Sequence, residues 1–410
     1  MEDILNQSLL VGSLLLLVSI FLSKSSSKFS LPILLLFIFV GIIAGSEGFG
    51  VINFNNYELT HSLSLVALCL IIFSGGLETK WKDVKPEVYR GTLLSSVGVI
   101  LTALIVGLTT KYFTSLSYIE SFLIGAILSS TDAAAVFFAF KDKKAQVRKP
   151  LKSILEFESG SNDPMAYFLV ATLLGLQEVQ VTSWSEPGIE FLINISIGLA
   201  GGLIISKIFK AINDHIILDF QGLYPALTLA FLFLNYSLVT QLGGNGFLSV
   251  YIFGITMGNQ KILHKHALSN FYDGISWLSQ IGLFVVLGLL VVPSRLAEVS
   301  IPAVAISLCL IFIARPLATH ICLFKSHFQF KEKFFISWAG LKGASPIVFA
   351  SFAATHLNSQ ANLIFDIVFF TVVFSALIQG STMKALAKKM GLLFEAVEDS
   401  AFPVDMELLE

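Results

Sequence analysis

Long apolar segments separated by short polar linkers run through most of this 410-residue sequence. About 13 such segments can be distinguished by their length and hydropathy. They lie at roughly 4–23, 29–45, 62–77, 91–110, 120–140, 152–175, 190–209, 223–240, 246–258, 274–292, 299–320, 334–354 and 362–381. Several are shorter than the about 20 residues that a helix needs to cross a bilayer, so their ends are approximate. The pattern predicts an all-α polytopic membrane protein with about 13 transmembrane helices.

The composition agrees with this fold class and excludes several others. Hydrophobic residues make up 55% of the sequence and charged residues only 13%, which is typical of a membrane protein rather than a soluble domain. The formal net charge of −2 gives no electrostatic basis for binding nucleic acid. Cys69, Cys309 and Cys322 are widely spaced, which predicts neither a disulfide framework nor a metal site.

The distribution of basic residues predicts the orientation in the membrane. If the N-terminus lies outside, the inner loops and the C-terminal segment hold most of the 26 lysines and arginines. The outer loops then keep only Lys111 and Arg295. Because basic residues collect on the cytoplasmic side, we expect an outer N-terminus, a cytoplasmic C-terminus and an odd number of helices. Residues 1–383 form the transmembrane domain in this interpretation, and residues 384–410 form a short acidic cytoplasmic tail.

Polar or small residues interrupt two of the apolar segments. The fifth contains Ser129-Ser130-Thr131-Asp132-Ala133, and the twelfth contains Gly340-Leu341-Lys342-Gly343-Ala344-Ser345-Pro346. If the helix at 190–209 is a linker, the halves at 4–175 and 223–381 form two inverted six-helix repeats, and both interruptions fall at the fifth helix of a half. Matching broken helices in inverted repeats indicate the substrate site of a transporter.

The sixth segment carries an acidic cluster, Glu156-Phe157-Glu158-Ser159-Gly160-Ser161-Asn162-Asp163-Pro164. Carboxylates inside a membrane are costly and usually bind an ion or move a proton. At 1.5 Å per residue, Asp163 lies about 16 Å from the inner face and Asp132 about 18 Å from the outer face. Lys342 reaches a similar depth, so three charged side chains from three helices converge near the midplane.

Helical spacing sorts the residues of this cluster. Glu156, Ser159 and Asp163 share one helix face, and Glu158 and Asn162 lie on the neighbouring face. Asp163 is the predicted carrier, because a lone carboxylate there is either protonated or bound to a cation.

The broken fifth segment is expected to complete the site. Ser159 and the carbonyls freed at Thr131 and Asp132 would supply neutral oxygen ligands to a hard monovalent cation. Asp132 adds charge to the site or, alternatively, only caps the broken helix. Asp273 and Asp366 lie at segment starts, and we expect both to be helix caps.

Five charged residues have supporting roles in this interpretation. Arg315 and Glu158 lie about 8 and 9 Å from the inner face, which suggests a buried structural ion pair. Glu156 is the rival partner, or else it lines an acidic inner funnel. Lys342 either neutralises the core or positions the crossed helices, and the structural role is favoured. Glu78 is either a carboxylate that supports the site without contacting the ion, or a residue at the membrane interface.

Three motifs together resemble the NhaP-type monovalent cation:proton antiporters: Glu158-Ser159-Gly160-Ser161-Asn162-Asp163-Pro164, Thr131-Asp132-Ala133-Ala134-Ala135 and Gly340-Leu341-Lys342-Gly343-Ala344. Segments 271–281 and 287–291 also look like the bacterial potassium/proton branch of that family. The resemblance implies an NhaA-like fold in the bacterial inner membrane, a six-helix core domain moving against a dimerisation domain, a homodimer, and no cofactor.

The resemblance also implies residue roles. Asp163 would exchange cation for proton, surrounded by Asn162, Ser159, Thr131 and Asp132. Arg315 resembles the family arginine that pairs with the glutamate matching Glu158. An asparagine before the carrier aspartate is similar to the electroneutral class of exchangers.

The sequence departs from the family pattern at two places. Lys342 stands where the family usually has arginine, so the two-pronged contact of a guanidinium is in doubt. Potassium-branch members often continue into a cytosolic regulatory domain, whereas this sequence stops after an acidic tail with Glu395, Glu398, Asp399, Asp405 and Glu407. Either such gating is absent or the sequence is truncated.

We therefore expect a secondary antiporter that exchanges K⁺, with Na⁺ possible, for H⁺ by alternating access. A Na⁺(Li⁺)/H⁺ antiporter of the same fold is the alternative. A cation channel is the rival from another class, although the sequence lacks a carbonyl-filter motif. An enzyme is not expected, because Ser159 and Ser161 have no histidine partner at matching depth.

Overall fold

The computed structural model describes residues 2–29, 33–50, 52, 54–132, 136, 140, 146–178, 185–216, 218–262, 265–357 and 360–394. Two parts of the predicted pattern, Ala133-Ala134-Ala135 and the acidic residues of the tail from Glu395 onward, lie outside these ranges. The helices of the first half are α1 (Glu2–Phe29), α2 (Ile33–Ala44), α3 (Tyr57–Glu78), α4 (Trp81–Val84), η1 (Lys85–Glu87), α5 (Val88–Leu93), η2 (Leu94–Gly98), α6 (Val99–Phe113), α7 (Tyr118–Ile127) and α9 (Lys149–Glu178).

The chain continues as a second series of helices. They are α10 (Ser185–His215), α11 (Leu223–Gln241), α12 (Gly246–Gly258), α13 (Lys265–Leu290), α14 (Pro293–Glu298), α15 (Ser300–Cys309), η3 (Leu310–Ala314), α16 (Arg315–Cys322), α17 (Phe330–Trp338), α18 (Ala344–His356), α19 (Ala361–Ser375), η4 (Ala376–Gly380) and α20 (Ser381–Lys389). Two short strands, β1 (Gln146–Val147) and β2 (Leu393–Phe394), pair antiparallel and join the segment before α9 to the segment after α20.

Each predicted apolar segment contains a helix, although described residues at 128–132 and 339–343 within two of the segments are not helical. Among the described residues, 7 helices are long and apolar enough to span a membrane, and four further apolar helices are shorter. The predicted helical membrane fold is confirmed, apart from the short β1–β2 pairing. The count of 13 crossings and the inverted repeats remain predictions.

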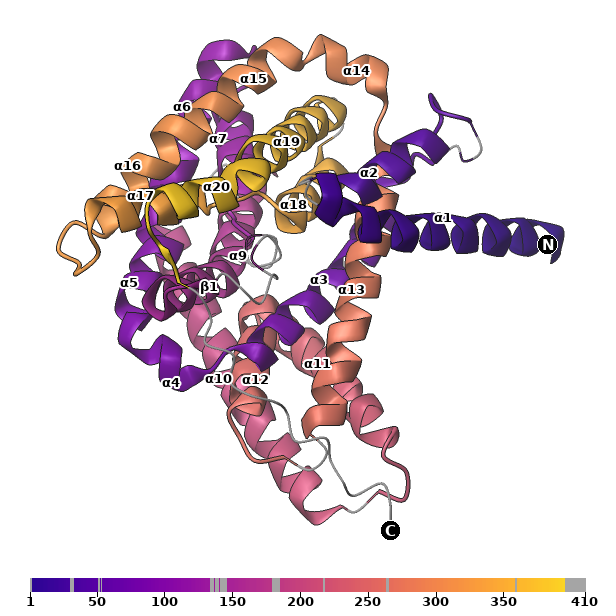
Figure 1. Ribbon diagram of the computed structural model, residues 1–410, viewed down its shortest axis with the longest axis vertical. Coiled ribbons are helices and arrows are strands. Elements are labelled where there is room, and N and C mark those ends of the chain that lie inside the picture. The colour runs from indigo at the N-terminus through magenta and orange to yellow at the C-terminus, as the bar shows by residue number, and fades with distance from the viewer. Residues whose placement is uncertain are drawn as a thin grey trace.

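The helices form two groups that meet along the middle of the molecule (Figure 1). In one group α3 packs against α12 and α13, α2 packs against α13, and α10 packs against α11 and α12. The other group contains α6, α7, α9, α15, α18 and α19. Contacts of α3 with α18 and of α12 with α9 join the two groups.

A pair of glycines allows α3 and α12 to approach closely. A Cβ atom on Gly76 would lie 2.8 Å from the carbonyl oxygen of Tyr251 and 3.2 Å from the Cα of Gly254. Any side chain at either glycine would therefore push α3 and α12 apart, and would displace their residues that contact α18 and α9.

Three π-helical turns, η2, η3 and η4, interrupt long helices of the group that contains α6, α15 and α19. A π turn adds one residue to a helical turn and often occurs at functional sites. The η3 turn ends directly before Arg315, and η4 contains Gln379. Both turns thus adjoin the polar interior described below.

The expectation that Asp273 and Asp366 are helix caps is wrong. α13 begins at Lys265, well before Asp273, and α19 begins at Ala361. Asp366 is buried inside α19, where its Oδ2 lies 3.0 Å from Arg295 Nε. α13 extends into polar sequence before its predicted start at 274. α19 begins within one residue of its predicted start at 362, but Asp366 lies too far inside that helix to cap it.

Candidate functional site

Two broken helices meet where the sequence places its interruptions. α7 ends at Ile127 and residues 128–132 are not helical. α17 ends at Trp338, and α18 begins at Ala344 after five non-helical residues. The backbone N–H of Asp132 donates to the carbonyl oxygen of Leu341 at 2.9 Å, so the two unwound segments are joined directly.

The close approach of the two unwound segments depends on Gly343. A Cβ atom at this position would overlap the carboxyl group of Asp132. Only a residue without a side chain therefore lets Asp132 lie against the start of α18. This placement puts Asp132 beside the second break.

Asp163 lies on α9, opposite this crossing, and both of its carboxylate oxygens accept hydrogen bonds. Ser130 Oγ donates to Asp163 Oδ1, and Ser345 Oγ donates to Asp163 Oδ2 at 2.8 Å. Ser130 comes from the first broken segment and Ser345 from the second. Asp163 is 7% exposed, so its carboxyl group is held in the interior by one hydroxyl from each broken segment.

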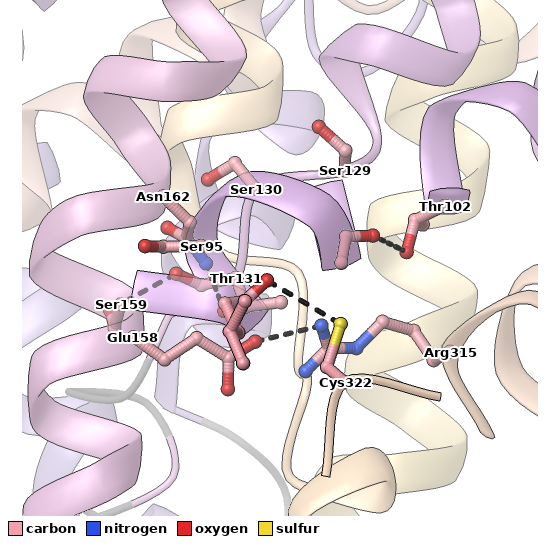
Figure 2. Close-up of polar contacts among 12 residues, drawn as sticks. Ser95, Thr102, Ser129, Ser130, Thr131, Glu158, Ser159, Asn162, Arg315 and Cys322 are labelled. Atoms are coloured by element: carbon pink, nitrogen blue, oxygen red, sulfur yellow. Dashed lines mark hydrogen bonds and ion pairs between the residues drawn. The ribbon is translucent and has the colours of Figure 1, made fainter. Parts of the chain in front are cut away.

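Thr131 binds two side chains on consecutive turns of α9. Ser159 Oγ donates to the Thr131 carbonyl oxygen at 3.0 Å, and Asn162 Nδ2 donates to Thr131 Oγ1 at 2.5 Å. Figure 2 shows both side chains directed toward Thr131. Among the described residues, Asn162 Oδ1 has no hydrogen-bond partner. These contacts fix the first broken segment against α9.

The predicted ion pair between Glu158 and Arg315 is present. Arg315 Nη1 donates to Glu158 Oε1 at 2.8 Å, and both side chains are 1% exposed (Figure 2). Arg315 Nε and Nη2 have no hydrogen-bond partner in the described part of the chain. A Cβ atom on Gly340 would overlap the guanidinium group, so the ion pair also packs against the second break.

Lys342 reaches the carbonyl end of α7. Its Nζ donates to the carbonyl oxygen of Ser130 at 2.8 Å, and the oxygen of Ser129 lies at 3.5 Å. Its backbone N–H donates to Ser375 Oγ at 3.3 Å, and that hydroxyl donates to Gln379 Oε1 at 2.6 Å. The ammonium group therefore holds the two broken segments together through backbone carbonyls.

A cavity of about 140 Å³ leads to Asp163. Six predicted site residues line it: Glu78, Thr131, Asp132, Glu156, Ser159 and Asp163. The other four, Asn162, Glu158, Arg315 and Lys342, are buried outside its lining. Glu156 also forms an ion pair with Lys152 at 3.5 Å, so it is not the partner of Arg315.

The chemistry of the cavity is that of hard oxygen ligands. Carboxylate, hydroxyl and carbonyl oxygens gather around Asp163, and hard cations prefer such ligands. In the part of the chain that the structure describes, no group of three or more His, Cys, Asp or Glu side chains could hold a metal ion. The arrangement can bind one small cation or one proton at Asp163.

The structure adds residues that the sequence reasoning missed. Ser130 and Ser345 are hydrogen-bonded to Asp163, and Tyr251 and Gln280 line the cavity. Both serines lie within the interruptions that were identified, so the same depth argument that selected Lys342 would have selected Ser345. Gln280 on α13 lies in the segment 271–281 that resembles the potassium/proton branch, whereas no comparable signal marks Tyr251 on α12.

Comparisons with known proteins identify relatives along nearly the whole chain. The family described as "Sodium/hydrogen exchanger, transmembrane" matches residues 13–389. The K(+)/H(+) antiporter NhaP of Alkalimonas amylolytica is 38% identical over 98% of this chain and 70% of its own length. The K(+)/H(+) antiporter NhaP2 of Shewanella baltica is 39% identical over 94% of this chain and 67% of its own length.

The fold also matches a solved structure. The sodium proton antiporter MjNhaP1 from Methanocaldococcus jannaschii aligns with a TM-score of 0.82 at 23% identity. The alignment covers 95% of this chain and 99% of that protein.

Proposed function

The chain belongs to the sodium/hydrogen exchanger family, and from that premise we propose that it exchanges a monovalent cation for a proton at Asp163. The membership confirms the resemblance to the NhaP-type antiporters that the sequence motifs indicated. It makes the protein a multi-pass membrane transporter of the cation/proton antiporter type. The residue that carries the ion, the cation and the transport cycle are the proposal.

The single observation that carries the proposal is the environment of Asp163. Its carboxyl group is buried at the crossing of two broken helices, accepts hydrogen bonds from two hydroxyls, and lines a cavity that also contains Glu78 and Glu156. A carboxylate this deep in a membrane is costly unless it is protonated or bound to a cation. Cation and proton therefore compete for the same two oxygens.

Competition at one carboxylate gives exchange without leak. The neighbouring Asn162 is neutral, so loading with either a proton or a monovalent cation removes one negative charge. The protein changes between its inward and outward states only when Asp163 is loaded, because moving the unpaired charge of the empty carboxylate through the membrane is costly. One cation is then exchanged per proton, which makes the transport electroneutral.

We propose K⁺ as the favoured cation, because the two K(+)/H(+) antiporters above are the more similar relatives. Na⁺ is the alternative, because a sodium proton antiporter shares the fold. We also propose a homodimer in the bacterial inner membrane, with the N-terminus outside and the C-terminus in the cytoplasm. The excess of basic residues in the inner loops supports this orientation.

The test is recovery of an imposed proton gradient in inside-out vesicles, titrated with K⁺ and then with Na⁺. The proposal predicts a saturable response with K⁺ effective at lower concentration than Na⁺. Asp163→Asn should lose the response while its folded dimer remains. Retained exchange in that variant would refute the assignment of Asp163. A preference for Na⁺ would keep the mechanism and change the cation, and a current without proton coupling would indicate a channel.

A further inference from the structure

Ser345 contacts the proposed carrier but has no part in the exchange described so far. It lies at the second position of α18, is 6% exposed, and donates from Oγ to Asp163 Oδ2 at 2.8 Å. The buried hydroxyls of Ser206, Ser307 and Ser351 donate to carbonyls of their own helices, whereas Ser345 bonds to a side chain of another helix. It also lines the cavity that leads to Asp163.

Ser130 makes the equivalent hydrogen bond from the other broken segment, but its position differs. Ser130 is 0% exposed and is not among the residues that line the cavity. Its carbonyl oxygen is bound by Lys342 Nζ at 2.8 Å. A cation that arrives through the cavity therefore meets Ser345, whereas Ser130 orients Asp163 from behind.

A serine hydroxyl is both a donor and an acceptor, and its hydrogen rotates to suit the partner. Toward an ionised carboxylate it donates. Toward a cation that lies on that carboxylate, the same oxygen turns its lone pairs and becomes a neutral ligand. No backbone movement is needed for this change, because only the hydroxyl hydrogen rotates.

We propose that Ser345 is a ligand of the transported cation and helps to determine its selectivity. Its hydroxyl donates to Asp163 when the carboxylate is ionised and empty, and coordinates the cation when it is bound. This inference rests on the proposed exchange at Asp163 and deepens it. It assigns to the second broken helix a direct share in the ion site.

Two consequences follow from loss of this hydroxyl. The bound cation loses one oxygen ligand, so KM should rise about tenfold at constant pH, as for loss of a hydrogen bond to a charged group. The empty carboxylate loses one donor, which favours its protonated form. The pH of half-maximal exchange should then move upward, since a more alkaline solution is needed to free the carboxylate for the cation.

The experiment uses the full-length protein in proteoliposomes and measures cation-dependent proton exchange for K⁺, Na⁺ and Tl⁺ between pH 6 and 9. Ser345→Ala is compared with Ser351→Ala, a matched control. Ser351 is also buried on α18, but its Oγ donates to the carbonyl oxygen of Val348. The control should keep the wild-type KM and pH profile.

Ser345→Cys provides a second variant that retains the size of the side chain. Sulfur is a softer ligand than oxygen, so the KM for K⁺ and Na⁺ should rise more than the KM for the soft cation Tl⁺. A merely structural serine would lower the maximal rate or the folded yield for all three cations equally. This variant therefore tests the inference even if Ser345→Ala does not fold.

The outcomes separate this inference from the proposed function. Increased KM, an alkaline shift of the profile and a relative preference for Tl⁺ in the cysteine variant would support a role as a ligand. If wild-type exchange depends on Asp163 but the Ser345 variants match Ser351→Ala in KM, pH profile and selectivity, the inference is wrong and the proposed function stands. If wild-type protein shows no exchange, the proposed function itself fails.

Discussion

Breaking the Glu158–Arg315 ion pair should destabilise the fold in a way that depends on which partner is removed. Both side chains are 1% exposed and a single 2.8 Å contact joins them. Glu158→Gln leaves a guanidinium that cannot deprotonate and has no other hydrogen-bond partner in the described part of the chain. Removing one partner of a buried pair costs about 3–5 kcal/mol, and we expect the free energy of unfolding to fall by that amount.

Arg315→Met should be less damaging at low pH. The glutamic acid left behind can take up a proton, so its buried charge disappears as the pH falls. The double variant should be more stable than Glu158→Gln alone, because no uncompensated charge remains. The assay is urea unfolding in detergent micelles, followed by tryptophan fluorescence at pH 5.5 and pH 8.

Two results would refute this reasoning. One is a loss below about 1 kcal/mol for Glu158→Gln, the value typical of an exposed pair. The other is a double variant as unstable as Glu158→Gln, which would show that packing rather than unpaired charge determines the loss.

Three further predictions concern the crossing and the cavity. Lys342→Met removes the hydrogen bond to the Ser130 carbonyl, and its free energy of unfolding in micelles should fall by about 1.5–3 kcal/mol. Lys342→Arg retains charged donors and should retain exchange activity. An equal loss of stability and of exchange activity in both variants would contradict a carbonyl-binding role. Gly343→Ala should lower the melting temperature through overlap with Asp132 at a cost of about 1–3 kcal/mol, and Gly282→Ala, where a Cβ meets nothing within 4 Å, is the control that should match wild type. Removing charge from the cavity with Glu78→Gln and Glu156→Gln should raise the KM for K⁺ a few-fold at low ionic strength and much less at high ionic strength; a change that is independent of salt would argue against electrostatic attraction.

The sequence predicted the crossing better than the details of the ion site. A break at Gly340–Pro346 follows from small residues and proline inside an apolar segment, and the structure has non-helical residues there. The Glu158–Arg315 pair was predictable because two opposite charges at equal depth in a membrane have few other partners. The composition of the apolar segment was sufficient to predict the break, and depth in the membrane was sufficient to predict the ion pair.

Other features lack a local sequence signal. Serines are common in membrane helices, so the hydroxyls of Ser130 and Ser345 could be linked to Asp163 only after the helices were placed in space. Asp366 was interpreted as a cap because it lies near the predicted start of its helix, but it is inside α19, and its pairing with Arg295 depends on the path of α14. The π turns before Arg315 and at Gln379 arise from packing between helices, which no local propensity encodes.

The most direct test of the central claim is proton release when K⁺ binds to purified protein in weakly buffered detergent solution. If cation and proton compete for Asp163, saturating K⁺ at a pH where the carboxyl group is protonated should release about one proton per bound cation. Asp163→Asn should release none, whereas Ser351→Ala should match wild type. Cation binding without proton release, or undiminished release from Asp163→Asn, would contradict the account.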